Sequence, residues 1–167
     1  MELLNNLELI DVREFSTKSL AGELDDFSLL ADMDFQEKEM LARQMHVYRA
    51  TAGADIFGEG DQGVFICFIL DGKVELIKDT DDGRHKRLTL VGPGKTVGEM
   101  ALIDGERRSA SARCVTDANV AVLTKIGFDK LAEAHLALAF KLMWRLAKLV
   151  SQRLRQTTGM LVDHLAG

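Results

Sequence analysis

Cysteine and histidine are scarce in this sequence. Only two of its 167 residues are cysteines, Cys67 and Cys114, and both lie in apolar, strand-like runs. Two cysteines do not make a disulfide framework, so we expect buried, reduced thiols in a cytosolic protein. The histidines lack the spacing of metal ligands, and no metal site is predicted. They are His46, His85, His135 and His164.

Long apolar runs and an excess of basic residues are also missing. No run approaches the roughly 20 apolar residues of a membrane span. The N-terminal stretch has no basic region and carries acids among its apolar residues, unlike a secretory signal. We therefore expect a cytoplasmic protein with no membrane partner. The formal net charge of −5 disfavours nucleic acid as the main partner.

The charge is nevertheless unevenly distributed. Residues 1–24 hold five acids against two bases, whereas residues 136–167 hold five bases against one acid. This asymmetry could seat the N-terminal segment on the last helix. It could equally reflect two solvated faces.

Proline occurs once, as Pro93 in the tight turn at 92–94. Between residues 46 and 126, short β-rich runs alternate with turn signals roughly every 8–12 residues, which predicts a small all-β barrel or sandwich. The run 73–78 alternates apolar and polar residues, so one of its faces is predicted to be buried. Asp82-Gly83 predicts a hairpin turn, and 118–126 is the last expected strand.

Helical patterns flank this region. Residues 35–45 read as a helix with Asp34 as its cap, and 127–135 as a second, short helix. A long helix is expected over 136–158. The resulting fold class is mainly β with flanking helices, a β-roll of the jelly-roll type followed by a long C-terminal helix. A chain of 167 residues is long enough to bury the hydrophobic core of such a fold.

The long helix carries a heptad-like seam. The seam could pack on the protein's own barrel, pair with a second copy, or do both. Two sets of residues repeat at intervals of seven: Met143, Val150, Thr157 and His164, and also Leu146, Arg153 and Met160.

The stretch GEMALIDGERRSASA, residues 98–112, interrupts the β-rich region. It is either a mixed-charge surface turn or an anion site. Gly98 follows a strand-like run, and 99–103 can form a helical turn whose free N–H groups suit an anion. The fork of Arg108 and the hydroxyl of Ser109 could grip a phosphate as well. Glu99 would repel a phosphate unless it serves a neighbouring hydroxyl, and a ribose cyclic phosphate offers both groups.

At these residues the sequence resembles the cyclic nucleotide-binding domain family. The family's phosphate-binding cassette looks like G-E-x-A-L-x-x-G-x-x-R-S/A/T-A, which GEMALIDGERRSA matches through Ala110. The glycine-marked turns in IFGEGD, FILDGKVEL and LVGPGKTVGE are similar to the family's turns, so the resemblance covers about residues 25–158. It implies an N-terminal segment of unknown role at 1–24, a nucleotide-binding roll at 25–135 and a C-terminal helix at 136–167, acting as lid and possible dimerisation element.

The resemblance also assigns roles to the cassette residues. Glu99 would accept the ribose 2′-hydroxyl, and Arg108 would pair with the equatorial phosphate oxygen. Ser109 would donate its hydroxyl and N–H to the same phosphate. Gly98 would let the backbone approach, and N–H groups near Ala101 would help. The remaining arginine, Arg107, is expected to be solvated or paired with an acid; in the roll, the positions that match the pocket lining are Leu76 and Leu88, with Thr89 beside them.

The bacterial catabolite activator branch is the most similar part of the family. Its long helix carries an arginine followed by two hydroxyl residues that touch adenine, one of them across a helix dimer. Arg153, Thr157 and Thr158 have this spacing. The alternative is a fraying polar helix end, which Gly159 favours because glycine often terminates helices.

Several functions follow as hypotheses. We expect a cyclic nucleotide sensor that favours cyclic AMP over cyclic GMP, works as a homodimer and acts on an unknown effector protein. A dinucleotide ligand remains possible. A second hypothesis is the sensory portion of a DNA-binding regulator, although residues 1–167 contain no basic recognition helix and Met1 favours a complete chain.

A third hypothesis is a protein-interaction domain that has lost its nucleotide. It would require Glu99 and Arg108 to be engaged with each other or with neighbours. An enzyme is not expected, because no catalytic constellation of Ser, His, Cys or Asp appears in the sequence.

Overall fold

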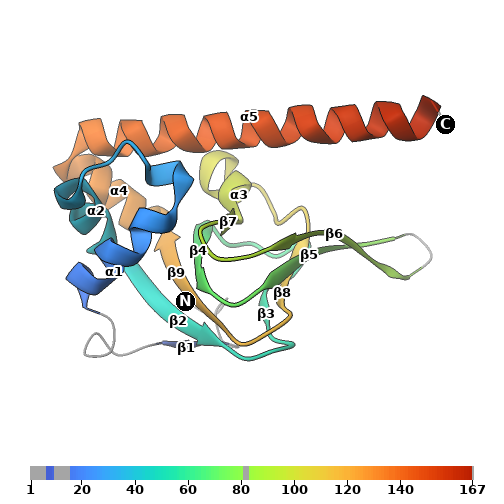
Figure 1. Cartoon of the computed structure of the whole chain (residues 1–167), viewed down its shortest axis with the longest axis horizontal. Coiled ribbons are helices and arrows are strands. Elements are labelled where there is room, and N and C mark those ends of the chain that lie inside the picture. The colour runs from blue at the N-terminus through green and yellow to red at the C-terminus, as the bar shows by residue number, and fades with distance from the viewer. Residues whose placement is uncertain (1–6, 10–15, 81–82, 167) are drawn as a thin grey trace.

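The computed structural model describes residues 7–9, 16–80 and 83–166, and its framework is two antiparallel sheets (Figure 1). One sheet has the strand order β1-β2-β9-β4-β7 and the other β3-β8-β5-β6. The strands are β1 (Glu8–Leu9), β2 (Met45–Ala50), β3 (Asp55–Phe57), β4 (Phe65–Asp71), β5 (Val74–Asp79), β6 (His85–Val91), β7 (Thr96–Val97), β8 (Ser111–Cys114) and β9 (Ala118–Thr124).

Helices gather on the outer side of the first sheet, and the last helix runs the length of the molecule (Figure 1). This confirms the predicted fold class, a β-rich roll with flanking helices and a long C-terminal helix. The helical elements are α1 (Thr17–Glu23), η2 (Leu24–Asp26), η3 (Ser28–Leu30), α2 (Phe35–Ala42), α3 (Glu99–Asp104), α4 (Lys125–Ala134) and α5 (Leu136–Ala166).

Strand β4 is buried on both faces. Phe65 and Cys67 belong to the core between the two sheets, whereas the alternate residues Ile66 and Phe68 belong to the core beneath the helices. A continuous apolar run, rather than an alternating one, is what a strand in this position requires. The helical core includes Leu142 and Leu146 of α5, so the long helix is fixed to the same sheet that forms one wall of the roll.

The predicted helix at 35–45 is shorter than expected, because α2 ends at Ala42. Asp34 is confirmed as its cap: its side chain accepts from the N–H of Glu37 at 2.8 Å, and Glu37 accepts from the N–H of Asp34 at 3.0 Å. Met45 instead begins β2, where it pairs with Leu123 of β9. The sheet hydrogen bonds therefore end the helix.

The predicted end of the long helix near Gly159 is wrong, because α5 continues to Ala166. Gly159 has no positive φ and sits in the helix interior. A glycine there costs about 1 kcal/mol relative to alanine, which neighbouring helical residues can offset. In the described part of the chain, no helix combines the length and the apolar character needed to cross a membrane.

Basic residues of α5 pair with acids of the segment 32–37. Lys141 lies 2.7 Å from Glu37, and Arg145 lies 3.0 Å from Asp32. The acids Glu2, Asp11 and Glu14 lie outside the described residues. Asp82 of the predicted hairpin also lies outside them; its neighbour Gly83 has φ +76°, and the N–H of Thr80 donates to the carbonyl of Arg84 to close the β5–β6 hairpin.

Both thiols are free and buried, as the sequence predicts. Burial raises the pKa of Cys67 to about 12 and that of Cys114 to about 11. We expect neither thiol to react with a disulfide reagent at pH 8 in the native protein, and both to react in denaturant. A native thiol that is labelled at the rate of a free cysteine would contradict this burial.

The same shifts give a pH dependence. Because an unfolded thiol ionises near its ordinary pKa of about 8.5, the two thiols stabilise the fold fully below that pH and progressively less as the pH rises toward 11. The urea concentration at the midpoint of unfolding should decrease from pH 7 to pH 9 and again to pH 10. The decrease should be smaller in the Cys67→Ala variant, which lacks one of the two thiols.

Two glycines with left-handed backbones bound the short helix α3. Gly98 precedes it with φ +80°, and Gly105 follows it with φ +72°. A Cβ on Gly98 would lie 2.5 Å from Nη1 of Arg108, 3.1 Å from the Phe57 ring and 3.2 Å from the carbonyl oxygen of Phe65. A Cβ on Gly105 would meet nothing within 4 Å.

These glycines form a matched pair for mutation. Gly105→Ala should cost only the left-handed conformation, about 1–2 kcal/mol. Gly98→Ala should cost clearly more, because it also displaces Arg108. Urea unfolding of the two variants measures the difference, and equal losses of stability would contradict a close packing of Arg108 on Gly98.

Candidate functional site

A pocket of about 220 Å³ opens at the segment that joins the two sheets. Strand β7 leads into α3, and the loop after α3 leads into β8. The pocket brings together seven residues singled out from the sequence: Leu76, Gly98, Glu99, Ala101, Arg108, Ser109 and Ala110. Phe57, Met100, Asp104, Glu106 and Arg107 complete its lining.

Arg108 is a buried cation in this pocket, with an exposed fraction of 4%. Its guanidinium lies between two aromatic rings, 4.1 Å from the centroid of Phe57 and 4.2 Å from that of Phe65. Nη1 donates to the carbonyl of Gly98 and Nη2 to that of Phe65, both at 2.9 Å. Burial lowers the pKa of Arg108 below its ordinary value, but an arginine stays charged in a folded protein. The pocket therefore has a fixed positive wall.

Arg108 forms no ion pair with the described acids, although the charge of Asp61 acts on it at longer range, and its Nε has no hydrogen-bond partner. Cation–π contacts and carbonyl acceptors offset part of the cost of burying its charge. An anion bound in the pocket would supply the remaining compensation for the buried charge of Arg108.

Glu99 is the second buried charge, also 4% exposed. Its Oε1 accepts from Nη1 of Arg153, a residue of α5, and the two groups form an ion pair. Nη2 of Arg153 donates to the carbonyl of Thr96 at 3.0 Å. The other carboxylate oxygen of Glu99 has no hydrogen-bond partner. Arg153 of α5 is therefore held at the cassette by its ion pair with the carboxylate of Glu99.

Ser109 and Arg107 are exposed at the rim of the pocket. The carbonyl of Ser109 accepts from Nζ of Lys78 at 2.9 Å, and the same ammonium donates to Glu59 at 2.7 Å. Arg107 donates to the carbonyl of Gly60 at 2.8 Å. The expectation for Arg107 is met in its exposure, although its partner is a carbonyl and not an acid.

Five of the candidate residues do not line the pocket: Arg153, which reaches it only through Glu99, and four others. Leu88 is 54% exposed on β6, and Thr89 is exposed opposite Leu76 in the β5–β6 register. Thr157 and Thr158 are exposed on α5, where their hydroxyls donate to the carbonyls of Arg153 and Leu154 at 2.9 Å. Their predicted contacts to a nucleotide stay predictions.

Sequence reasoning missed the supports of Arg108. Phe57 lies in the IFGEGD run and Phe65 in an apolar strand, and nothing in either pattern marks a ring that stacks on a guanidinium. Lys78 was likewise not singled out. The predicted alternation of residues 73–78 is interrupted by a register shift between Leu76 and Ile77, so Ile77 is buried and Lys78 is exposed. The described residues contain no group of three or more His, Cys, Asp or Glu side chains that could hold a metal ion.

Comparison with known proteins identifies relatives that are similar to this chain in sequence. A cyclic AMP receptor protein of Thermus thermophilus is 37% identical over 107 residues, which cover 62% of this chain and 46% of that protein. A CRP-like cAMP-activated global transcriptional regulator of Mycobacterium tuberculosis is 28% identical over 123 residues, 74% of this chain and 53% of that protein. The chain therefore spans about half the length of the curated relatives it matches.

Solved structures agree with this grouping. The crystal structure of a cyclic nucleotide-binding domain from Methylobacillus flagellatus has a TM-score of 0.83 and 26% sequence identity, covering 98% of this chain and 92% of that one. The family profile described as "Cyclic nucleotide-binding domain" matches residues 48–135, which include the roll and the cassette. The resemblance drawn from the cassette is confirmed: this chain belongs to the cyclic nucleotide-binding domain family.

Proposed function

We propose that this chain is a sensor that binds cyclic AMP in the cassette pocket and passes occupancy on through α5. The observation that carries the proposal is the pair of buried, opposite charges in one pocket, Arg108 and Glu99, with the carboxylate tied to α5 by Arg153. A cation and a carboxylate a few residues apart suit a ligand with a phosphate beside a hydroxyl.

In this mechanism Arg108 and Ser109 bind the cyclic phosphate. Gly98 and the N–H groups near Ala101 let the phosphate approach the backbone, and Ala110 keeps the wall small. The free oxygen of Glu99 accepts the ribose 2′-hydroxyl.

Leu76 packs beside the sugar. We assign Leu88 and Thr89 of the neighbouring strand β6 to the nucleotide as well, although neither lines the pocket in this structure. Cyclic AMP is favoured over cyclic GMP because Ser109, not threonine, follows the cassette arginine, and because of the hydroxyl pair on α5. No metal is required, and we expect the nucleotide to be released unchanged, since this is a binding module and not an enzyme.

Transmission depends on Arg153. A nucleotide that binds Glu99 alters the ion pair between that carboxylate and Arg153. The helix α5 can then shift relative to the roll. Such a shift is a population change between two arrangements, driven by the ligand's preference for one of them. Thr157 and Thr158 lie one turn further along α5, and we assign them to the adenine, with one supplied by a second copy.

We also propose that the chain divides into three segments, with boundaries after residues 24 and 135. A cytoplasmic location is proposed as well, because free thiols suit a reducing compartment. As an alternative, we propose that this chain is the sensory portion of a DNA-binding regulator, because its matches cover only about half of each curated relative. In either case we expect no nucleic-acid or membrane contact from this chain itself.

A second candidate function is a protein-interaction domain without nucleotide. It is favoured by one observation: Glu99 and Arg108 are both engaged with neighbours in this structure. Nucleotide binding separates the two functions directly, because only the sensor binds cyclic AMP.

We expect calorimetry to detect cyclic AMP binding to the wild-type protein, with weaker binding of cyclic GMP. Arg108→Ala should weaken cyclic AMP binding by about 30-fold or more, since a charged hydrogen-bonding partner is worth about 2 kcal/mol. Arg107→Ala is the matched control, an adjacent exposed arginine whose loss should leave affinity within about twofold.

Because Arg108 also supports the loop, circular dichroism must show that its variant is folded. Ser109→Ala gives an independent readout, with a loss of about tenfold or more for one hydrogen bond to a charged phosphate. Equal affinity in wild type and a folded Arg108→Ala variant would refute the phosphate assignment. Absence of any nucleotide binding by the wild type would favour the interaction domain.

We further propose that α5 forms a homodimer. Leu146 of the predicted seam packs in the protein's own core, whereas Phe140, Leu154 and Leu161 are exposed and spaced by multiples of seven. A stripe of this spacing is typical of a helix that pairs with another helix.

Sedimentation velocity should show a dimer at micromolar concentration. Leu154→Lys places a charge in the stripe and should shift the protein toward monomer. Gln156→Lys adds the same charge to an exposed position on the other side of α5, and it should leave the dimer intact. A monomeric wild type, or a dimer unaffected by Leu154→Lys, would contradict pairing through this face.

A further inference from the structure

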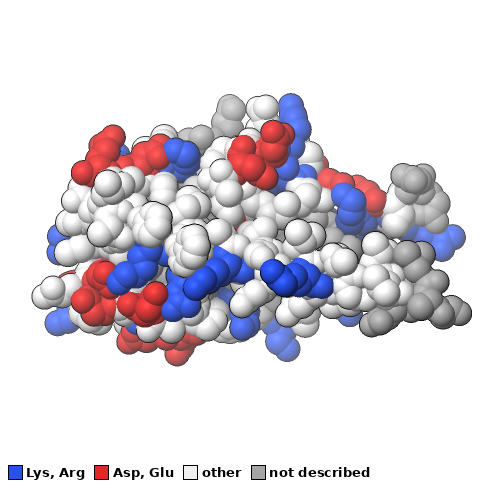
Figure 2. All heavy atoms as spheres, turned by 90° about the horizontal axis from the view of Figure 1, so that it is seen from above, with Lys and Arg blue, Asp and Glu red and all other residues white. Residues whose placement is uncertain are grey.

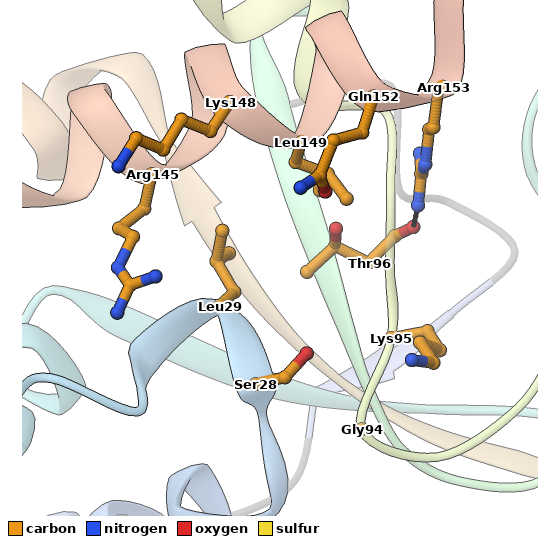
Figure 3. Close-up of a pocket in the computed structure, with 10 residues that line it drawn as sticks. All are labelled: Ser28, Leu29, Gly94, Lys95, Thr96, Arg145, Lys148, Leu149, Gln152 and Arg153. Atoms are coloured by element: carbon orange, nitrogen blue, oxygen red, sulfur yellow. Dashed lines mark hydrogen bonds between the residues drawn. The ribbon is translucent and has the colours of Figure 1, made fainter. Parts of the chain in front are cut away.

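A second cavity, of about 130 Å³, lies under α5. It is enclosed by α5, by η3 and by the turn that leads into β7 (Figure 3). Four basic residues line it and no acidic residue does: Lys95, Arg145, Lys148 and Arg153. It shares no lining residue with the cassette pocket.

Two of these cations are neutralised and two are not. Arg145 pairs with Asp32 at 3.0 Å, and Arg153 pairs with Glu99. Among the described residues, Lys95 and Lys148 have no acidic partner, although Nζ of Lys148 lies over the Trp144 ring, 5.5 Å from its centroid. Figure 2 shows the resulting band of Lys and Arg side chains across the α5 side of the molecule. The cavity therefore carries an unbalanced positive charge.

A buried hydroxyl adds a hydrogen-bonding group to this charge. Thr96 is 2% exposed, lines the cavity, and its Oγ1 has no hydrogen-bond partner in the described structure. Figure 3 shows this hydroxyl on the α5 side of the threonine, facing Leu149 and Gln152. Gln152 itself is exposed. A buried hydroxyl is rarely left unpaired without a reason.

We propose that this cavity is a binding site for a small oxyanion of the phosphate class, separate from the cassette. The ammonium group of Lys95 supplies the charge, joined by that of Lys148 when it leaves the Trp144 ring, and Arg153 lines the same cavity. The hydroxyls of Thr96 and Ser28 supply directional donors on opposite walls. Several donors arranged around one space suit a tetrahedral phosphate, which accepts hydrogen bonds in all directions.

The test is a titration followed by amide NMR shifts, with inorganic phosphate and glycerol phosphate as separate arms. Sodium chloride at equal ionic strength is the reference. We expect saturable shifts at Ser28, Gly94 and Thr96 with one or both phosphates. Saturation by glycerol phosphate alone assigns the site to an organic phosphate monoester, and saturation by both assigns it to the phosphate group itself.

Three variants make the assignment specific. The double variant Lys95→Gln, Lys148→Gln should bind phosphate about tenfold more weakly, since each exposed charge contributes about threefold. Lys130→Gln changes an exposed lysine of α4 and should have no effect. Thr96→Val keeps the shape of the side chain, should leave the melting temperature unchanged or higher, and should weaken phosphate binding.

Shifts that grow linearly without saturation, or that sodium chloride reproduces, would overturn the proposal. So would undiminished binding by the double lysine variant. Shifts confined to residues 98–110 would place phosphate in the cassette alone, which would overturn this site and leave the proposed nucleotide site standing.

Discussion

The burial of the Arg108 guanidinium is the constraint on which the candidate site depends. A charge removed from water needs compensation, and here it comes from two aromatic rings and two backbone carbonyls. Phe57 belongs to one sheet, Phe65 to the other, and Gly98 to the start of α3. The cation thus joins both sheets to the cassette, and it leaves a fixed positive wall in the pocket.

The second constraint is the ion pair between Glu99 and Arg153. It joins the first residue of a six-residue helix to a helix of 31 residues that packs on the outer face of the first sheet. Arg153 also holds the carbonyl of Thr96, at the entrance to α3. Both the pocket that contains Glu99 and the cavity under α5 therefore adjoin the same arginine.

Much of the fold is predictable because local patterns and burial agree. Strand-length apolar runs separated by turn residues indicate a β-roll, and the long apolar pattern after residue 136 indicates its helix. The errors lie where tertiary contacts compete with local preference. Met45 is helix-compatible but pairs with Leu123 in the sheet, and Gly159 is a common helix terminator that the surrounding helix tolerates.

The sequence by itself determined the cassette, since the spacing of Gly98, Glu99 and Arg108 is local and their chemistry is carried by residue type. Only the tertiary structure decided what surrounds them. The stacking of Phe57 and Phe65 on Arg108 and the reach of Arg153 to Glu99 join residues that are far apart along the chain. Such contacts follow from how the sheets and α5 pack, and residue periodicity contains no information about them.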